Sequence, residues 1–232
     1  MFYSTRIENG FAYIDEEESR HLTTVLRYKA GDRLEITNGK GSFFTAELTE
    51  IGKRYAVARV MTEQKMPPAL AQLHLAIAPT KNIDRFEWLL EKAVEIGIDT
   101  ISPILCRHSE RTVIRHDRLE KVVVSAMKQS LRAYLPTLAP LTPFREVLLK
   151  STAPQRFIGW CPPDQEMPHV KKALQPGLDT IIFIGPEGDF SPEEIQLAQA
   201  HKCLPITLGK ARLRTETAGI YACSVFNLAQ EG

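Results

Sequence analysis

The stretch "IIFIGPEGDFSPEEI" (Ile181–Ile195) joins a strand pattern to a helix start, and it indicates the class of fold. Its first residues are apolar, as in a strand that is buried on both faces of a parallel sheet. Ser191 as N-cap, Pro192 at the first helical position and Glu194 at the third predict that a helix begins here. Capping does not account for Gly185–Gly188, and glycines in such a loop let a ligand approach the backbone.

The charge of this stretch bears on which ligand the loop would bind. A phosphate loop follows a G-x-G-x-x-G or G-x-x-x-x-G-K-[ST] pattern, and the stretch contains neither. It carries carboxylates that would repel a pyrophosphate, namely Glu187, Asp189, Glu193 and Glu194. A neutral or cationic ligand fits better, for example an adenosyl group with a sulfonium cation. The alternative is a tight turn that binds no ligand.

A second strand end with unusual residues lies in "ITLGKARLRTETAG" (Ile206–Gly219). The apolar run is followed by a basic loop with Lys210, Arg212 and Arg214. Thr215 is then expected to cap the next helix. Taken alone, this is typical of a solvated basic loop before a helix. Because ligands bind beyond the carboxyl ends of parallel strands, the two loops together predict one crevice, acidic on one side and arginine-rich on the other.

The first part of the chain reads as a small barrel. Residues 1–66 contain short apolar or alternating runs separated by turn signals, which predict strands joined by tight turns. One helix is expected among them, over residues 16–27, with Leu22, Val25 and Leu26 on one face.

The pattern changes after a segment at residues 67–72, which we interpret as a linker because it is uncharged and proline-bearing. Residues 73–232 alternate between strand and helix patterns, which predicts an α/β fold with a mostly parallel sheet covered on both faces. In its first helix, Asp84 and Glu87 are expected to form a capping box, and Gly97 to end the helix.

Composition limits the class of protein. The chain has 232 residues, of which 44% are hydrophobic and 25% charged, as in an ordinary globular protein. No apolar run is long enough to cross a membrane, and none after Met1 resembles a signal peptide, so a cytoplasmic protein is expected. The sequence has no metal-ligand spacing, no H-E-x-x-H and no G-x-S-x-G, so neither a metal site nor a serine nucleophile is expected. Buried, idle thiols are expected for Cys106, Cys161, Cys203 and Cys223.

Charge is nearly balanced overall, at +1, but one segment is basic. Between Arg107 and Arg132 there are seven Lys or Arg residues against three acidic ones. Such a run is commonly a solvated helix face. The functional alternative is a surface that binds the phosphate backbone of RNA.

Several of these stretches, taken together, resemble a known family. "IGPEGDFS", followed later by "LGKARLRTETA", is similar to the late motifs of the bacterial 16S ribosomal RNA uracil-N3 methyltransferases of the SPOUT superfamily. "RHLTTVLRYKAGD" near the start and "QSLRAYLP" (Gln129–Pro136) agree with it. The resemblance covers essentially the whole chain, in the same order. Two positions depart from the pattern: Asp189 replaces a glycine, and Arg212 is displaced by one position.

The resemblance implies a PUA-like β-barrel domain that binds RNA at residues 1–66, a linker at 67–72, and a SPOUT α/β domain with a trefoil knot at 73–232. It implies S-adenosylmethionine as cofactor and a homodimer that acts on 16S rRNA or the small ribosomal subunit, with no metal and no membrane partner. The reaction would be methylation of N3 of a uridine.

The resemblance also implies roles for individual residues. Arg214 would stabilise the charge that develops on the uracil, because a guanidinium is always cationic and donates in a fork. Glu216 is a candidate base, although a carboxylate in a first helical turn is also an ordinary dipole partner. The cofactor would be held by Thr80, Ile184, Gly185, Pro186, Glu187, Gly188, Thr207, Leu208, Gly209, Leu213, Thr215 and Thr217. RNA would be held by Arg6, His21, Arg27, Arg107, Arg111 and Arg132.

Three other classes of protein remain as alternatives. A Rossmann-type nucleotide enzyme would carry G-x-G-x-x-G after the first strand of the second part, and "LAIAPTKNID" lacks it. A non-catalytic RNA-binding relative would have a damaged cofactor loop. A SPOUT methyltransferase that acts on a different RNA would share every motif named above.

Overall fold

The computed structural model describes residues 1–52, 54–160 and 166–231. By their contacts the residues form two compact units, which are described separately. The first comprises Met1–Pro68 together with Val124–Leu135.

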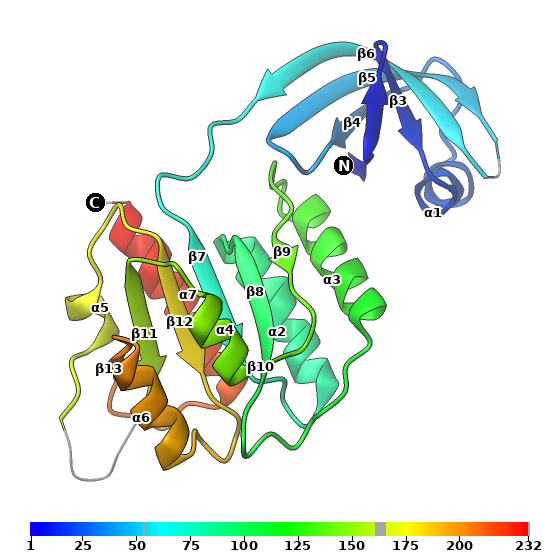
Figure 1. The fold of residues 1–232 in the computed structure, drawn as a ribbon. Helices are drawn as coiled ribbons and strands as arrows, with labels where there is room; N and C mark the ends of the chain where they lie inside the picture. Colours follow the sequence, from blue (N-terminus) through cyan, green and yellow to red (C-terminus); the bar gives the residue numbers. More distant parts are fainter. Residues whose placement is uncertain (53, 161–165, 232) are drawn as a thin grey trace. The chain divides into compact units, whose positions relative to one another are not determined.

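The first unit is built on a curled six-stranded sheet, which confirms the predicted small β-barrel as a half-open one (Figure 1). Its strand order is β1-β4-β5-β6-β3-β2, and every pairing is antiparallel except that of β1 with β4. The inner face holds a buried apolar cluster that includes Ile14, Leu34 and Ile36. The strands are β1 (Phe2–Tyr3), β2 (Arg6–Glu8), β3 (Phe11–Ile14), β4 (Arg33–Thr37), β5 (Ser42–Ile51) and β6 (Ala56–Lys65).

The helix of this unit differs from the single amphipathic helix that the sequence predicts. It begins as α1 (Glu16–Arg20) and continues as a wider π-helical turn, η1 (His21–Leu26). The change of pitch alters which residues share a face, so Leu22 is buried while Val25 and Leu26 are exposed.

Residues 124–135 belong to the first unit by their contacts, whereas the sequence pattern assigned them to the second part. The amide of Gly41 donates to the carbonyl of Ala133 (2.9 Å), and the amide of Leu135 donates to the carbonyl of Gly39 (2.9 Å). Gly41 has φ +96°, and a Cβ there would lie 2.4 Å from the hydroxyl of Tyr134. These pairings join residues far apart in the sequence, which a local pattern cannot reveal.

The second unit comprises Ala69–Val123 and Pro136–Gly232. Its seven-stranded sheet has the order β10-β8-β7-β12-β11-β13, with β9 beside β8, and all pairings are parallel. This confirms the predicted parallel α/β fold. The strands are β7 (Leu73–Ile77), β8 (Thr100–Leu105), β9 (Thr137–Leu138), β10 (Thr142–Pro143), β11 (Gln155–Gly159), β12 (Thr180–Ile184) and β13 (Leu204–Ile206).

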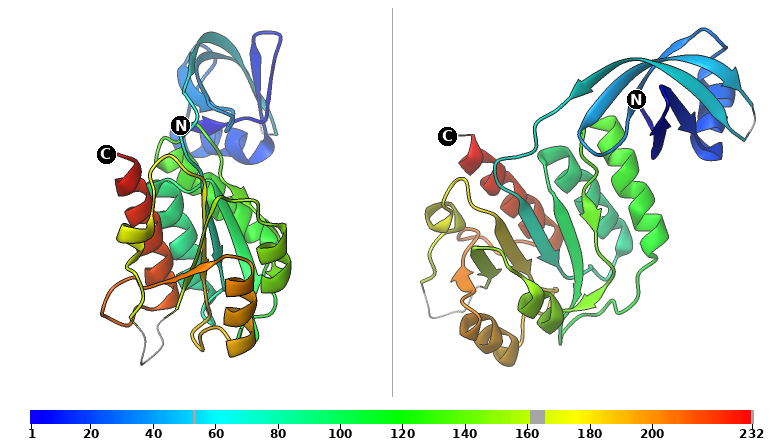
Figure 2. Two further views of the ribbon diagram at one scale, coloured as in Figure 1. Left: turned by 60° about the vertical axis from the view of Figure 1, so that its left-hand side comes forward. Right: turned by 45° about the horizontal axis from the view of Figure 1, so that its top comes forward.

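Helices cover both faces of this sheet (Figure 2). On one face α2 and α7 pack against each other, and α7 packs on β7 and β12; on the other face lie α4 and α6. Apolar side chains such as Phe144 and Phe183 fill the core beneath α4 and α6. The helices are α2 (Ile83–Ile96), α3 (His116–Gln129), α4 (Phe144–Lys150), α5 (Val170–Ala173), α6 (Pro192–Ala200) and α7 (Thr215–Gln230), with the end of α3 counted in the first unit.

The helix ends agree in part with the sequence patterns. The capping box at Ser191 is confirmed, and Gly97 ends α2 with φ +121°. The capping box at Asp84 is wrong, because the N-cap of α2 is Asn82, whose side chain accepts from the amide of Asp84. Thr215 is not a cap either, since it is the first residue of α7. The knot expected from the resemblance stays a prediction.

Cys106, Cys203 and Cys223 are buried and free of disulfides, as the sequence predicts, and Cys161 lies outside the described residues. Burial raises the pKa of the Cys203 and Cys223 thiols to about 12, which makes them poor nucleophiles. In the part of the chain that the structure describes, no helix is long and apolar enough to cross a membrane.

Candidate active site

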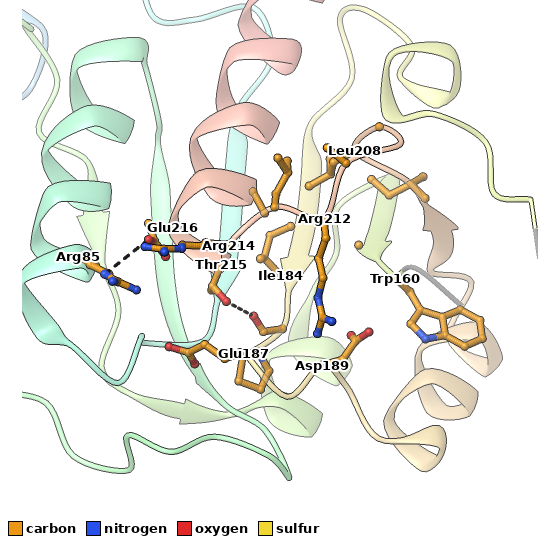
Figure 3. Close-up of a pocket in the computed structure, with 18 residues that line it drawn as sticks. Arg85, Trp160, Ile184, Glu187, Asp189, Leu208, Arg212, Arg214, Thr215 and Glu216 are labelled. Carbon is orange, nitrogen blue, oxygen red and sulfur yellow. Dashed lines mark hydrogen bonds and ion pairs between the residues drawn. The ribbon is translucent and has the colours of Figure 1, made fainter. Parts of the chain in front are cut away.

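A pocket of about 450 Å³ lies in the second unit, where the loops after β12 and β13 meet (Figure 3). These are carboxyl ends of parallel strands, the edge at which α/β sheets bind ligands. The sequence predicts this meeting of the two loops. The pocket is lined by Arg85, Gly159, Trp160, Ile184, Gly185, Pro186, Glu187, Asp189, Ile206, Leu208, Gly209, Ala211, Arg212, Leu213, Arg214, Thr215, Glu216 and Ala218.

The loop after β12 is a tight turn in which the amide of Asp189 donates to the carbonyl of Pro186 (2.9 Å). A Cβ at Gly185 would lie 3.0 Å from the ring of buried Phe190, so a side chain there would require the ring to shift. Asp189 has φ +64°, a conformation that glycine, asparagine and aspartate adopt most readily. Its Oδ1 accepts from the amide of Phe190 (2.8 Å), which accounts physically for an aspartate where the family pattern has glycine.

The loop after β13 bends at Gly209, whose φ of +125° favours glycine. The hydroxyl of Thr207 bonds within the loop, to the carbonyl of Gly209 (2.9 Å). The hydroxyl of Thr215 donates instead across the pocket floor, to the carbonyl of Gly185 (3.2 Å), and Thr215 is buried. Thr215 therefore ties the two loops together.

One end of the pocket carries Arg85, Arg214 and Glu216, as Figure 3 shows. Glu216 is buried in the first turn of α7, and its Oε1 lies 3.9 Å from Nε of Arg85. Arg214 is exposed at the N-cap position of α7. The pocket thus brings together both residues predicted to be catalytic, and it adds Arg85, which the sequence did not indicate.

The other end carries Trp160, Asp189 and Arg212 (Figure 3). Partial burial raises the pKa of the Asp189 carboxyl, while the Phe190 amide and the charges of Arg212 and His108 act against this rise. Arg212 is exposed. The two residues that depart from the family pattern therefore face the same pocket.

The loop after β7 is hydrogen-bonded to Glu187 in the loop after β12. The amide of Lys81 donates to Oε1 of Glu187 (3.0 Å), and the guanidinium of Arg111 donates to the carbonyls of Thr80 (2.9 Å) and Lys81 (2.5 Å). The hydroxyl of Thr80 donates to the carbonyl of Asn82 (2.6 Å). Thr80 and Arg111 are therefore engaged in holding this loop.

Most residues predicted to bind the cofactor line the pocket, and four do not. Gly188 is packed against His108, and Thr217 is exposed on α7. Thr80 and Thr207 bond within their own loops. Their cofactor roles stay predictions. Six further lining residues were not among those predicted. Arg85, Gly159 and Trp160 lie outside the two motifs, whereas Ile206, Ala211 and Ala218 belong to the second motif itself.

The residues predicted to bind RNA fall into both units. In the first, Arg6 pairs with Glu8 and lies 4.2 Å above the ring of Tyr13. Arg107 and Arg111 are in the second unit. His21, Arg27 and Arg132 belong to the first unit, His21 lying in η1 and Arg27 ending it with φ +57°. No His, Cys, Asp and Glu cluster suited to a metal occurs among the described residues.

Comparisons with known proteins agree on one family. Residues 67–227 match the family model of an RNA methyltransferase domain, and residues 14–61 match that of an RNA methyltransferase PUA domain. The ribosomal RNA small subunit methyltransferase E of Rickettsia conorii is 30% identical over 210 residues, covering 90% of this chain and 85% of that protein.

Two solved structures share the whole fold. A protein from Porphyromonas gingivalis, described as a probable rRNA methyltransferase, is 39% identical, with a TM-score of 0.92 and coverage of 99% of this chain and 98% of that one. A ribosomal RNA small subunit methyltransferase E from Neisseria gonorrhoeae, bound to S-adenosylmethionine, is 27% identical, with a TM-score of 0.83 and coverage of 99% and 97%. The chain belongs to the family of RNA methyltransferases that includes the ribosomal RNA small subunit methyltransferases E.

Proposed function

We propose that this protein is an S-adenosylmethionine-dependent methyltransferase that methylates N3 of a uridine in 16S ribosomal RNA. The observation that carries the proposal is the single pocket formed by two glycine-bearing strand-end loops, tied by Thr215 and carrying Arg214 and Glu216 at one end. The relative from Neisseria, solved with this cofactor, and the name of the Rickettsia relative support the same reaction.

The pocket suits this cofactor in size and chemistry. Its volume of about 450 Å³ is within the range of small-molecule sites. Gly185 and Gly209 line the pocket together with apolar side chains such as Leu208, so adenine and ribose would meet both backbone groups and apolar surface. Glu187 and Asp189 line the side formed by the loop after β12, which favours a cation and opposes a phosphate on that side.

The chain's own residues would prepare the acceptor. When bound, the cofactor supplies a methyl group activated by a sulfonium. Uracil N3 must lose a proton, and the resulting negative charge spreads onto the two carbonyl oxygens of the base. The Arg214 guanidinium would stabilise this charge. Glu216 is the candidate to accept the proton, and Arg85, 3.9 Å away, would orient its carboxylate.

Basic residues of each unit would bind the RNA. Phosphate contacts from Arg27, Arg107 and Arg132 would position the RNA without reading its sequence. A target uridine that is stacked in the RNA has to be unstacked before its N3 reaches the pocket. We extend the proposal to a PUA-like domain at 1–66 and a SPOUT domain at 73–232, and to a cytoplasmic homodimer.

The test combines binding and turnover. Calorimetry with S-adenosylmethionine should show one site per chain. Purified protein should then methylate small ribosomal subunits from cells that lack the enzyme, and reverse transcription should stop at the product, because an N3-methyl group blocks base pairing. A protein that binds no cofactor would contradict the methyltransferase proposal. Transfer to another base or RNA would leave the cofactor site standing and replace the substrate.

A further inference from the structure

The pocket end with Asp189 and Arg212 carries two opposite charges that are not joined. Figure 3 shows the two side chains pointing toward one another beside Trp160. The positive charge of Arg212 acts to lower the pKa of Asp189, so the groups interact. No hydrogen bond or ion pair holds the Arg212 guanidinium within residues 1–52, 54–160 and 166–231.

Asp189 is held by hydrogen bonds within its own loop. Its Oδ1 accepts from the Phe190 amide (2.8 Å), and its own amide is bonded to Pro186. Nδ1 of His108 lies 3.1 Å from the carbonyl oxygens of both Gly188 and Asp189. The position of the carboxylate is therefore fixed by the backbone, while Oδ2 has no donor in the described part of the chain.

The other carboxylates of the pocket differ from Asp189. Glu187 already accepts from the Lys81 amide, and Glu216 lies against Arg85. The Asp189 and Arg212 pair thus offers both an acceptor and a cationic donor to a ligand. A phosphate would be repelled by the carboxylate, and a neutral group would leave both charges unmet. A group that carries an ammonium and a carboxylate on one carbon meets both.

We propose that Asp189 and Arg212 bind the amino-acid end of S-adenosylmethionine. Asp189 accepts from the α-ammonium group, and Arg212 pairs with the α-carboxylate. The two residues make the pocket selective for nucleosides that carry an intact amino acid. This inference rests on the proposed function, since it assumes that the pocket binds this cofactor.

The experiment is calorimetry with three probes. S-adenosylmethionine and S-adenosylhomocysteine share the amino-acid end but differ in the sulfonium charge, and 5′-methylthioadenosine lacks the amino-acid end. Asp189→Asn keeps the shape and tolerates the positive φ, and Arg212→Ala removes the guanidinium. Each variant should lower the affinity for S-adenosylmethionine and S-adenosylhomocysteine by about tenfold, the cost of one charged hydrogen bond. The affinity for methylthioadenosine should fall by less than about twofold.

Matched controls separate charge from folding. Lys210→Ala removes a neighbouring exposed cation that does not line the pocket, so all three affinities should stay unchanged. Arg212→Lys keeps the positive charge and should restore part of the lost affinity. Retained binding of methylthioadenosine shows that each variant still folds around the nucleoside.

Two results would overturn the inference. An equal loss for methylthioadenosine would mean that Asp189 and Arg212 contact the nucleoside instead. A loss for S-adenosylmethionine alone would mean that Asp189 acts on the sulfonium. A wild-type protein that binds none of the three probes would contradict the proposed function itself, which is a distinguishable outcome.

Discussion

Two of the pockets in the described part of the second unit have similar volumes, about 450 Å³ at the carboxyl ends of the strands and about 390 Å³ near their amino ends. The first exposes charged groups, such as Arg212, that have no hydrogen bond or ion pair with the described residues. In the second, polar groups bind one another: Oδ1 of Asp179 accepts from the Gln72 amide (2.8 Å), and Nε2 of His74 lies 2.8 Å from Oγ of Ser102. Volume alone therefore does not identify a binding site, whereas unmet charge does.

The second pocket is better understood as part of the structural framework. Burial lowers the pKa of His74 to about 4, so the ring is neutral at physiological pH. The hydroxyl of Thr180 donates to the carbonyl of Leu178 (3.0 Å) and so adds to the internal bonding. We expect changes in this pocket to alter stability and leave methyl transfer intact, and changes of the exposed charged residues in the first pocket to do the opposite.

The largest expected effect is that of Arg214→Ala. Removing a donor that stabilises developing negative charge should lower kcat by about 10²–10³-fold, with little change in cofactor affinity. Single-turnover kinetics and calorimetry measure the two quantities separately. Ser102→Ala in the second pocket is the matched control and should leave kcat unchanged. If Arg214→Ala instead abolishes cofactor binding, Arg214 belongs to the cofactor site.

The next effect concerns His74 and the pH dependence of stability. Its pKa is about 4 in the folded protein and about 6.5 when unfolded. The unfolded chain therefore binds more protons in this window, and stability falls as pH drops from about 6.5 to about 4. The loss amounts to as much as about 3 kcal/mol. Urea denaturation at several pH values measures it.

The control for this prediction is His74→Gln, which cannot titrate. The variant should lose most of the pH dependence between pH 4 and 6.5 that the wild-type protein shows, and it should methylate RNA normally at pH 8. An unchanged pH profile would assign the loss to other groups. A loss of methylation at pH 8 in a folded variant would break the distinction between the two pockets.

Local signals in the sequence predicted part of this architecture. The capping box at Ser191 and the glycine stop at Gly97 depend only on neighbouring residues, so their patterns are visible in the chain. The bond of Thr215 to Gly185 joins residues thirty positions apart. Arg85 lines the pocket from α2, the helix that follows β7. Contacts of this kind depend on the packed sheet, so no local pattern contains them.

A smaller effect is expected for Thr215→Val, which keeps the side-chain shape and removes the hydroxyl. Loss of its bond leaves the carbonyl of Gly185 with one partner fewer and should cost about 1 kcal/mol of stability. Cofactor affinity should fall several-fold, because the two loops are less firmly joined. Thermal unfolding and calorimetry measure both. Thr215→Ser retains the hydroxyl and should keep most of the wild-type stability and most of the cofactor affinity.

The smallest effect is expected for Arg85→Ala. The Arg85 side chain is half-exposed and its Nε lies 3.9 Å from Glu216, so the pair contributes under about 1 kcal/mol. We expect kcat to fall by about twofold to fivefold, since Glu216 remains buried by its helix and is only less well oriented. Raising the ionic strength should lower wild-type kcat slightly and leave the variant unaffected.

Arg118→Ala is the matched control for Arg85. Arg118 is also half-exposed, and it pairs with Glu87, which lies on α2 like Arg85 but does not line the pocket. It should leave kcat unchanged. A fall of more than about 100-fold for Arg85→Ala would exceed what such an ion pair supplies. Arg85 would then contact the RNA or the developing charge directly, and the catalytic end of the pocket would use two guanidinium groups rather than one.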